Sequence, residues 1–299
     1  MTAEEEILGI LGREGPLTGK ELLGFWGKDR FLLWQTCHAC ASLEIVSIGR
    51  RYLRLDERVE GYSRLSPSIL REFLTYTVIG TEPSAIRAKA ELLREEIGKI
   101  GEWKTRLAAE TVSLVLSRLS RHWTDRPQPC FVMAGDIAYG MAHEEPRPET
   151  STGRMVKGSD LDIVAILDDS VPDELFALLD EEIYKQKYQL LVNPAINQEI
   201  DYIVKKVSKF REQLRFDTFK RMIACKIIKE GFFLGGDRGL FDEVKLLLKE
   251  SGIEERVDAM EAGAALDRDR AVQTLTRADS MSSPLAGLFY STQESEEFD

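Results

Sequence analysis

The sequence predicts an α+β protein, with a few buried strands set in a chain that is otherwise largely helical. One observation is the apolar, β-branched run at residues 161–167, which is typical of a strand buried on both faces. A second is the alternating pattern at residues 197–204, with Ile200, Tyr202 and Val204 on one face, which is typical of another strand. A third is the helical spacing of apolar residues before, between and after these runs. At 299 residues and 43% hydrophobic, the chain has room for two or three modest domains with cores of their own.

Residues 1–62 are predicted to form a separate module of three helices and a hairpin. Apolar spacing places the helices at residues 4–11, 17–23 and 28–43, and Thr18 would cap the second. The hairpin would join residues 44–48 to 52–55, with Arg50 and Arg51 at its tip. This arrangement resembles a winged helix-turn-helix module, whose third helix approaches the major groove of DNA. Winged helices also bind proteins or position substrates, so contact with nucleic acid and contact with protein both stay open.

Residues 63–124 are predicted to be a helical bridge. A short helix is expected at 66–76 with Pro67 in its first turn, and a long helical stretch at 82–123, interrupted near Gly98 and Gly101. The buried face of the long stretch would carry Leu107, Val112, Val115, Leu116 and Leu119. This spacing favours packing of the bridge against the sheet that follows.

The strand at residues 157–167 carries two carboxylates, Asp160 and Asp162. Side chains alternate along a strand, so both carboxylates project the same way. Two neighbouring carboxylates repel each other, and burial disfavours their charge unless a cation holds them. Hard oxygen ligands beside a Gly-Ser turn suit Mg²⁺, which commonly also binds substrate phosphates. The alternative is a strand that begins at the surface with both aspartates in solvent, and the apolar residues that follow favour burial.

A third carboxylate, Asp201, lies on the second expected strand at residues 197–204. Between the two strands, residues 171–191 have helical spacing and Pro172 in the first turn. A strand, a helix and a strand in succession would place Asp201 next to the Asp160–Asp162 pair. Upstream, a short apolar strand at 130–134 runs into a turn that begins at Gly135.

These residues resemble the nucleotidyltransferase superfamily that includes DNA polymerase β and toxin-type transferases. Gly135 matches the glycine turn of that family, residues 159–163 (Ser-Asp-Leu-Asp-Ile) match its metal-binding strand, and Asp201 matches its third carboxylate. The resemblance implies a nucleotidyltransferase-like mixed sheet with helices at residues 125–208. It also implies that Asp160, Asp162 and Asp201 are the catalytic residues and hold Mg²⁺ (or Mn²⁺).

The nucleotide-binding residues implied by the resemblance are Gly135, Asp136, Lys157, Ser159 and Lys226. Asp136 departs from the family, which usually has Ser or Gly there against the triphosphate of the donor. A carboxylate at this position repels phosphate unless a metal or a basic residue intervenes. It must therefore face away, contact the metal or pair with a basic residue.

The connection between the glycine turn and the Asp160–Asp162 strand is also long for the family. Residues 141–158 are polar and contain two prolines. Two interpretations remain: a lid over the site, with Arg154 and Lys157 meeting phosphate, or a surface loop.

Residues 209–299 are predicted to be a helical region with an acidic tail. Helices are expected at 210–230 and 240–250, and the tail at 293–299. By resemblance, Lys226 or Arg221 would face the triphosphate. The alternative is that both are ordinary solvated helix charges.

Composition narrows the class of protein. No run approaches the roughly 18 apolar residues of a membrane span, and the acidic N-terminus is unlike a signal peptide. The four cysteines lie in apolar surroundings, which indicates reduced thiols and a cytoplasmic protein. Cys37 and Cys40 lack the second ligand pair of a zinc site. The net charge of −11 opposes broad electrostatic attachment to nucleic acid.

The expected function is the transfer of a nucleoside monophosphate from an NTP to an acceptor. RNA, protein and small molecules all remain candidates for that acceptor, and the resemblance includes bacterial toxin and defence systems. The competing hypothesis is a non-catalytic regulator that binds nucleic acid through its N-terminal module and senses a nucleotide. Asp136 favours the regulator, and the intact carboxylate set favours the enzyme. Neither hypothesis involves a membrane.

Overall fold

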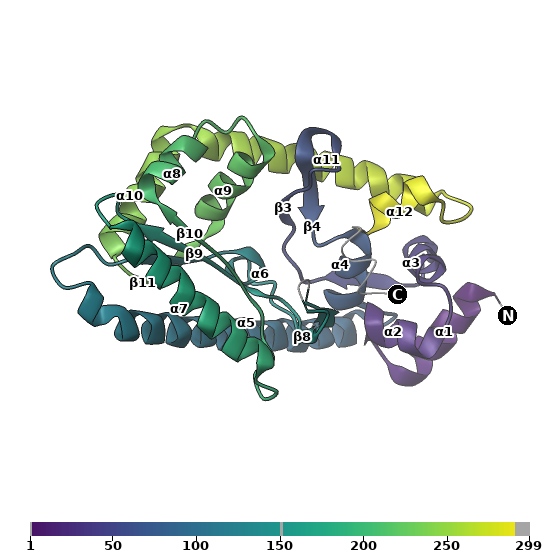
Figure 1. The fold of residues 1–299 in the computed structure, drawn as a ribbon. Helices are drawn as coiled ribbons and strands as arrows, with labels where there is room; N and C mark the ends of the chain where they lie inside the picture. Colours follow the sequence, from purple (N-terminus) through teal and green to yellow (C-terminus); the bar gives the residue numbers. More distant parts are fainter. Residues whose placement is uncertain (1, 150–151, 291–299) are drawn as a thin grey trace. The chain divides into compact units, whose positions relative to one another are not determined.

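The computed structural model describes residues 2–149 and 152–290, and it is a mixed α+β fold with several small sheets (Figure 1). The chain divides into two compact units. Unit 1 contains the residues up to Val59, Ser63–Ile97, and those from Glu261 onward. Unit 2 contains Glu60–Tyr62 and Gly98–Met260. The boundaries expected at residues 62, 124 and 208 rest on sequence pattern and stay a prediction.

Unit 1 begins with three helices, as predicted. Its helices are α1 (Ala3–Glu14), α2 (Gly19–Trp26), α3 (Arg30–Ala39), α4 (Ile69–Thr75), the first part of α5 (Pro83–Leu119), the last part of α11 (Ile253–Thr276) and α12 (Ser283–Phe289). Thr18 caps α2 as expected: its hydroxyl accepts a hydrogen bond from the backbone N–H of Glu21, and the Glu21 carboxylate accepts one from the Thr18 N–H. This reciprocal arrangement satisfies two of the N–H groups that a helix start leaves unpaired.

The predicted hairpin between residues 44 and 55 is wrong. The strands of unit 1 are β1 (Leu17–Thr18), β2 (Glu44–Ser47), β3 (Tyr52–Leu55), β4 (Ser63–Ser66) and β5 (Thr77–Gly80). Both flanking strands form, but β2 pairs with β5 in a sheet of order β1-β5-β2, and β3 pairs with β4. Strand β2 pairs instead with β5, a short segment inside the predicted bridge whose β-branched residues favour a strand.

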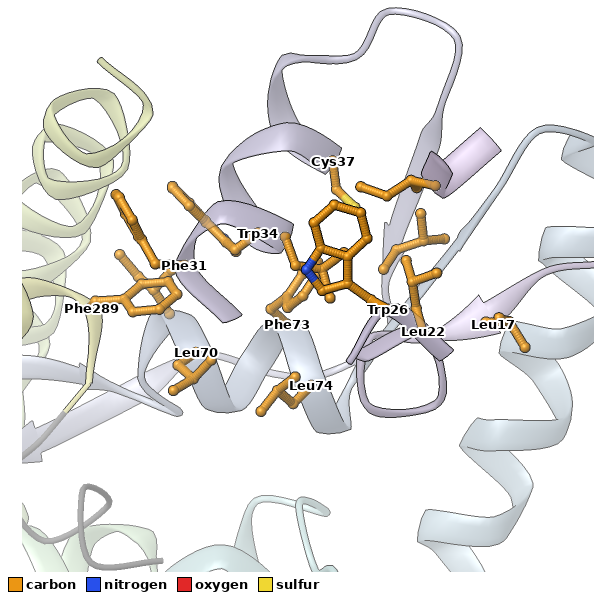
Figure 2. Packing of buried hydrophobic residues seen from close by; sticks show 14 of the residues in the cluster. Leu17, Leu22, Trp26, Phe31, Trp34, Cys37, Leu70, Phe73, Leu74 and Phe289 are labelled. Atoms are coloured by element: carbon orange, nitrogen blue, oxygen red, sulfur yellow. The ribbon is translucent and has the colours of Figure 1, made fainter. Parts of the chain in front are cut away.

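The core of unit 1 is aromatic and draws on distant parts of the sequence (Figure 2). Trp34 is almost fully buried, and its ring centroid lies 5.4 Å from that of Phe289, the last residue of α12. Phe31 contacts the same ring at 5.4 Å, edge to face. Phe73 of α4 belongs to this cluster as well. The first three helices therefore share one core with α4 and α12.

Unit 2 is built around a four-stranded mixed sheet of order β10-β9-β6-β11. Its strands are β6 (Cys130–Met133), β7 (Pro146–Pro148), β8 (Met155–Lys157), β9 (Leu161–Leu167), β10 (Ile200–Lys206) and β11 (Phe232–Gly236). Its helices are the remainder of α5, α6 (Gly135–Ala138), α7 (Asp173–Val192), α8 (Val207–Gln213), α9 (Phe219–Glu230), α10 (Arg238–Glu250) and the first part of α11, with 3₁₀ turns at Glu60–Tyr62 and Ser120–His122. Strands β9 and β10 are parallel, whereas β6 is antiparallel to β9 and β11 is antiparallel to β6.

Three details differ from the prediction for this region. Strand β10 begins at Ile200, three residues later than expected. Helix α5 runs without a break through Gly98 and Gly101, because helical glycine is tolerated where its neighbours are good helix formers. The expected helix at 210–230 is two helices, α8 and α9.

The two faces of the sheet have different partners. Leu161, Ile163 and Ala165 of β9 pack in one core with α5 and α7. The residues between them, beginning with Asp162, project from the opposite face, where α8, α9 and α10 lie (Figure 1). The carboxylates therefore stand on the face of the sheet that α5 and α7 do not cover.

No helix within residues 2–149 and 152–290 is both long and apolar enough to cross a bilayer. All four cysteines (Cys37, Cys40, Cys130 and Cys225) are buried free thiols. Among residues 2–149 and 152–290, one group of three or more side chains is arranged so that it could hold a metal ion, and it contains neither Cys37 nor Cys40. The structure therefore gives no support for a zinc site at these two cysteines. The acidic tail predicted at 293–299 lies outside the described residues.

Candidate metal and nucleotide site

Three carboxylates meet where β9 and β10 begin. In the parallel register Asp201 of β10 lies opposite Asp162 of β9, and Asp160 immediately precedes β9. One carboxylate oxygen from each of the three lies within 4.8 Å of the others. Asp201 is exposed, whereas Asp160 and Asp162 are half-buried. The structure thus brings together the three residues that the sequence singled out, with an open side at Asp201.

The electrostatics of this cluster disfavour full ionisation. Burial raises the pKa of Asp160 to about 6; Arg147 opposes this shift, and Asp136 adds to it. Burial also raises the pKa of Asp162 well above its usual range, and the charge of Asp160 is the next cause. Neighbouring carboxylates that resist losing their protons gain most from a bound cation, because the cation removes both penalties.

Gly135 makes the close approach at Asp162 feasible. Its φ is +66°, and a Cβ at this position would lie 1.8 Å from Oδ2 of Asp162. The preceding strand brings the turn there: β6 is antiparallel to β9, and the N–H of Ala134 donates to the Asp162 carbonyl at 3.0 Å. Only glycine combines this conformation with this contact. The turn therefore brings its backbone close to the carboxylate cluster.

Asp136 and Ser159, both predicted to bind nucleotide, are bonded to each other. The Ser159 hydroxyl donates to Oδ2 of Asp136 at 3.1 Å and accepts from the backbone N–H of His143 at 3.2 Å. Nε2 of His143 lies 3.8 Å from the same Asp136 oxygen. Nδ1 of His143 accepts from the N–H of Glu145, which leaves the proton of a neutral imidazole on Nε2. Asp136 is thus directed toward Ser159 and His143.

The connection between α6 and β9 forms a two-stranded ribbon, β7–β8, and Arg147 is its contribution to the site. A guanidinium nitrogen of Arg147 lies 2.9 Å from Glu199 and 3.5 Å from Asp160, and its Nε donates to the carbonyl of Gly158 at 2.9 Å. Gly158 itself abuts the His143 carbonyl, 1.8 Å from where a Cβ would stand. This connection is therefore packed against the carboxylates and supplies one positive charge to them.

A buried lysine donates hydrogen bonds to the segments that lead into both strands of the carboxylate site. Lys104 of α5 is 0% exposed. Its ammonium donates to the carbonyls of Lys157 at 2.9 Å and Ser159 at 2.6 Å, and to the side chain of Gln198. Burial lowers the pKa of Lys104 to about 8. Because these acceptors precede Asp160 on one side and Asp201 on the other, Lys104 links the two segments that lead into the carboxylate site.

A fourth acidic side chain borders the glycine turn. The carboxylate of Glu230, the last residue of α9, accepts from the N–H of Gly135 at 3.2 Å and from the hydroxyl of Tyr139 at 2.6 Å. It also forms an ion pair with Lys226, one helical turn earlier. Lys226 lies 5.4 Å from the Tyr139 ring centroid. Lys226 is therefore near the glycine turn, and its ammonium is engaged by Glu230.

Three further side chains were predicted to contact phosphate. The side chains of Lys157 and Arg154 are exposed. Arg221 pairs with Asp217 at 2.6 Å at the start of α9. Sequence reasoning missed the roles of Lys104, Arg147 and Glu230, because each depends on a partner far along the chain. A lysine on the apolar face of α5 was the one local signal available.

The arrangement offers hard oxygen ligands for a divalent cation and a backbone turn against them, with lysine and arginine side chains at the border. Such a site can bind a metal-complexed polyanion and remove a proton from a group that approaches Asp201. No family model, curated protein or solved structure matches this chain.

Proposed function

We propose that the protein is a metal-dependent nucleotidyltransferase that moves a nucleoside monophosphate from an NTP to an acceptor hydroxyl. The observation that carries the proposal is the meeting of Asp160, Asp162 and Asp201 within 4.8 Å on adjacent parallel strands. The close approach of Gly135 to Asp162 supports it, because a glycine turn is what lets phosphate reach backbone N–H groups.

The donor set fits Mg²⁺ or Mn²⁺. All three ligands are carboxylate oxygens, which suit these hard cations and not soft ones. Asp160 and Asp162 would hold the ions, and Asp201 would share one of them. When bound, the metal would offset charge on the phosphate oxygens and on the leaving group.

The chain's own residues have separate roles in the proposed transfer. Asp201 accepts the proton of the acceptor hydroxyl, since it is the exposed member of the set. The acceptor oxygen forms a bond to the α-phosphorus while the bond from that phosphorus to the bridging oxygen breaks. The electron pair of the broken bond leaves with pyrophosphate. Lys104 keeps Asp160 and Asp201 at the spacing that this in-line arrangement requires.

The test is incubation with each α-labelled NTP, Mg²⁺ and cell extract. We expect one nucleotide to label a macromolecule or a metabolite, and Asp201→Asn to abolish the labelling. Asp217→Asn is the matched control, because it removes one exposed carboxylate elsewhere in unit 2. Equal labelling by wild type and Asp201→Asn would refute the proposed chemistry.

A second candidate is the nucleotide-sensing regulator, and a specific observation favours it. Asp136 and Glu230 place two further carboxylates at the glycine turn, where a triphosphate would have to lie. A regulator would bind NTP without releasing pyrophosphate, so pyrophosphate release separates the two functions.

Unit 1 is proposed to deliver the acceptor through a winged-helix-like arrangement. Three helices and the β1-β5-β2 sheet support this, and so does the exposed Leu32 on α3. Arg51, in the connection between β2 and β3, pairs with Glu72 at 3.0 Å, so its charge is engaged within unit 1. The four unpaired thiols favour a cytoplasmic location.

A further inference from the structure

Three donors of different kinds converge on the carboxylate of Glu230. They are the backbone N–H of Gly135, the hydroxyl of Tyr139 and the ammonium of Lys226. The Glu230 side chain is 4% exposed and the Lys226 side chain 12%, so the interaction is largely removed from solvent. A buried carboxylate needs such compensation, because burial without it disfavours its charge.

The same three donors are those that a phosphate group would use. A backbone N–H at a glycine turn, a phenol and a lysine all donate to phosphate oxygens, and Gly135 abuts the carboxylate cluster at Asp162. Glu230 and a phosphate carry the same sign of charge. The two therefore compete for one set of donors, and both cannot be held there together.

We propose that Glu230 is a latch: in the nucleotide-free protein its carboxylate occupies the donors that bind the phosphate chain of the NTP. The latch rests on the proposed function and adds its regulation. Metal-bound triphosphate displaces Glu230 from Gly135, Tyr139 and Lys226, and the freed ammonium of Lys226 then contacts phosphate. The latch lowers the affinity of the protein for phosphate chains. Until such a chain binds, it also holds the ammonium of Lys226 in position.

The experiment is calorimetric titration of inorganic tripolyphosphate, with Mg²⁺ present, into the wild type and Glu230→Gln. The amide of glutamine still accepts a hydrogen bond, but it no longer carries the competing charge. We expect Glu230→Gln to lower the Kd on the order of tenfold, the effect of removing one nearby like charge. Asp217→Asn, the same charge change just before α9, should leave the Kd unchanged. A Kd equal to or higher than that of the wild type overturns the latch.

A second variant gives an independent reading. Lys226→Met should change the Kd only a few-fold in the wild type, where Glu230 already engages the lysine, and at least about tenfold in the Glu230→Gln background. Loss of binding on Lys226→Met alone overturns the latch, even where Glu230→Gln does not fold, and so does absence of tripolyphosphate binding in every variant. Tighter binding by Glu230→Gln together with no NTP transfer upholds the latch and refutes the transferase.

Discussion

Each unit contains a cluster of buried charged side chains, and the two clusters differ in how far opposite charges compensate their carboxylates. In unit 1, Glu72 lies between Arg268 at 2.6 Å and Arg51 at 3.0 Å. In unit 2, Asp160 and Asp162 face Asp201 and each other, with Arg147 at 3.5 Å from Asp160 as a nearby cation. Burial would raise the pKa of Glu72, but its two arginines outweigh it and hold that pKa below the usual value. The pKa values of Asp160 and Asp162 are raised.

The difference shows how charge reveals function in this fold. The protein's own arginines compensate the charge of Glu72. That cluster therefore stabilises unit 1, and binding of a ligand there would compensate little further charge. The aspartate cluster has more negative charge than the protein compensates, which is the state expected of a site whose missing partner is a cation. Mutations should therefore move stability in opposite directions in the two clusters.

The largest expected effect is at the compensated cluster. Arg268 is 6% exposed along its side chain, and Arg268→Met would leave the Glu72 charge buried beside Arg51 alone. We expect a loss of about 3 kcal/mol in the free energy of unfolding, measured by urea denaturation. Arg270→Met is the control: its pair with Asp267 is 76% exposed on the arginine side, and its loss should be negligible. Equal effects of the two changes would contradict the interpretation of unit 1.

Gly135→Ala should disturb the aspartate cluster more than the matched change Gly140→Ala does. Gly135 and Gly140 have φ values of +66° and +69°, so alanine is strained at both, by roughly 1 kcal/mol. A Cβ at Gly140 meets nothing within 4 Å, whereas one at Gly135 collides with Asp162. We therefore expect both variants to lose stability, and only Gly135→Ala to lose Mn²⁺ affinity. Parallel calorimetric titrations separate the two, and equal Mn²⁺ affinities would remove Gly135 from the site.

Asp162→Asn should stabilise the metal-free protein. It relieves repulsion with Asp160 and Asp201, a gain of about 1 kcal/mol in the free energy of unfolding. The same change should abolish the rise in melting temperature that Mg²⁺ with NTP gives the wild type, because a ligand stabilises only the state that binds it. Thermal melts with and without ligand measure both effects. An unchanged response to ligand would exclude Asp162 from the metal site.

The pH dependence sharpens the contrast further. The pKa of Asp160 is about 6 in the folded protein and near 3.8 when unfolded, so its contribution to stability falls as pH rises from 3.8 through 6. The contribution of Glu72, whose folded pKa is lowered, is present above pH 4.5 and is lost as pH falls. Asp160→Asn should therefore remove a destabilising slope between pH 4 and 6 in the metal-free protein. Urea titrations at several pH values show whether that slope disappears.

Local pattern was sufficient for part of this structure. Alternation along the expected strands at residues 157–167 and 197–204 placed the three aspartates on one side of adjacent strands, and Thr18 was predicted to cap the second helix. The pairing of β2 with β5 was out of reach, because it joins segments some thirty residues apart through a strand of four residues. Lys104 and Glu230 were missed for the same reason: their acceptors and donors come from other elements of unit 2.

The most direct test of the central claim is calorimetric titration of Mn²⁺ into the wild type, Asp160→Asn and Glu72→Gln. Both variants lose one carboxylate charge, but from clusters that the protein compensates differently. The expected result is binding by the wild type and by Glu72→Gln at similar affinity, and loss of binding by Asp160→Asn. Mn²⁺ binding of equal strength by Asp160→Asn and the wild type would contradict the account.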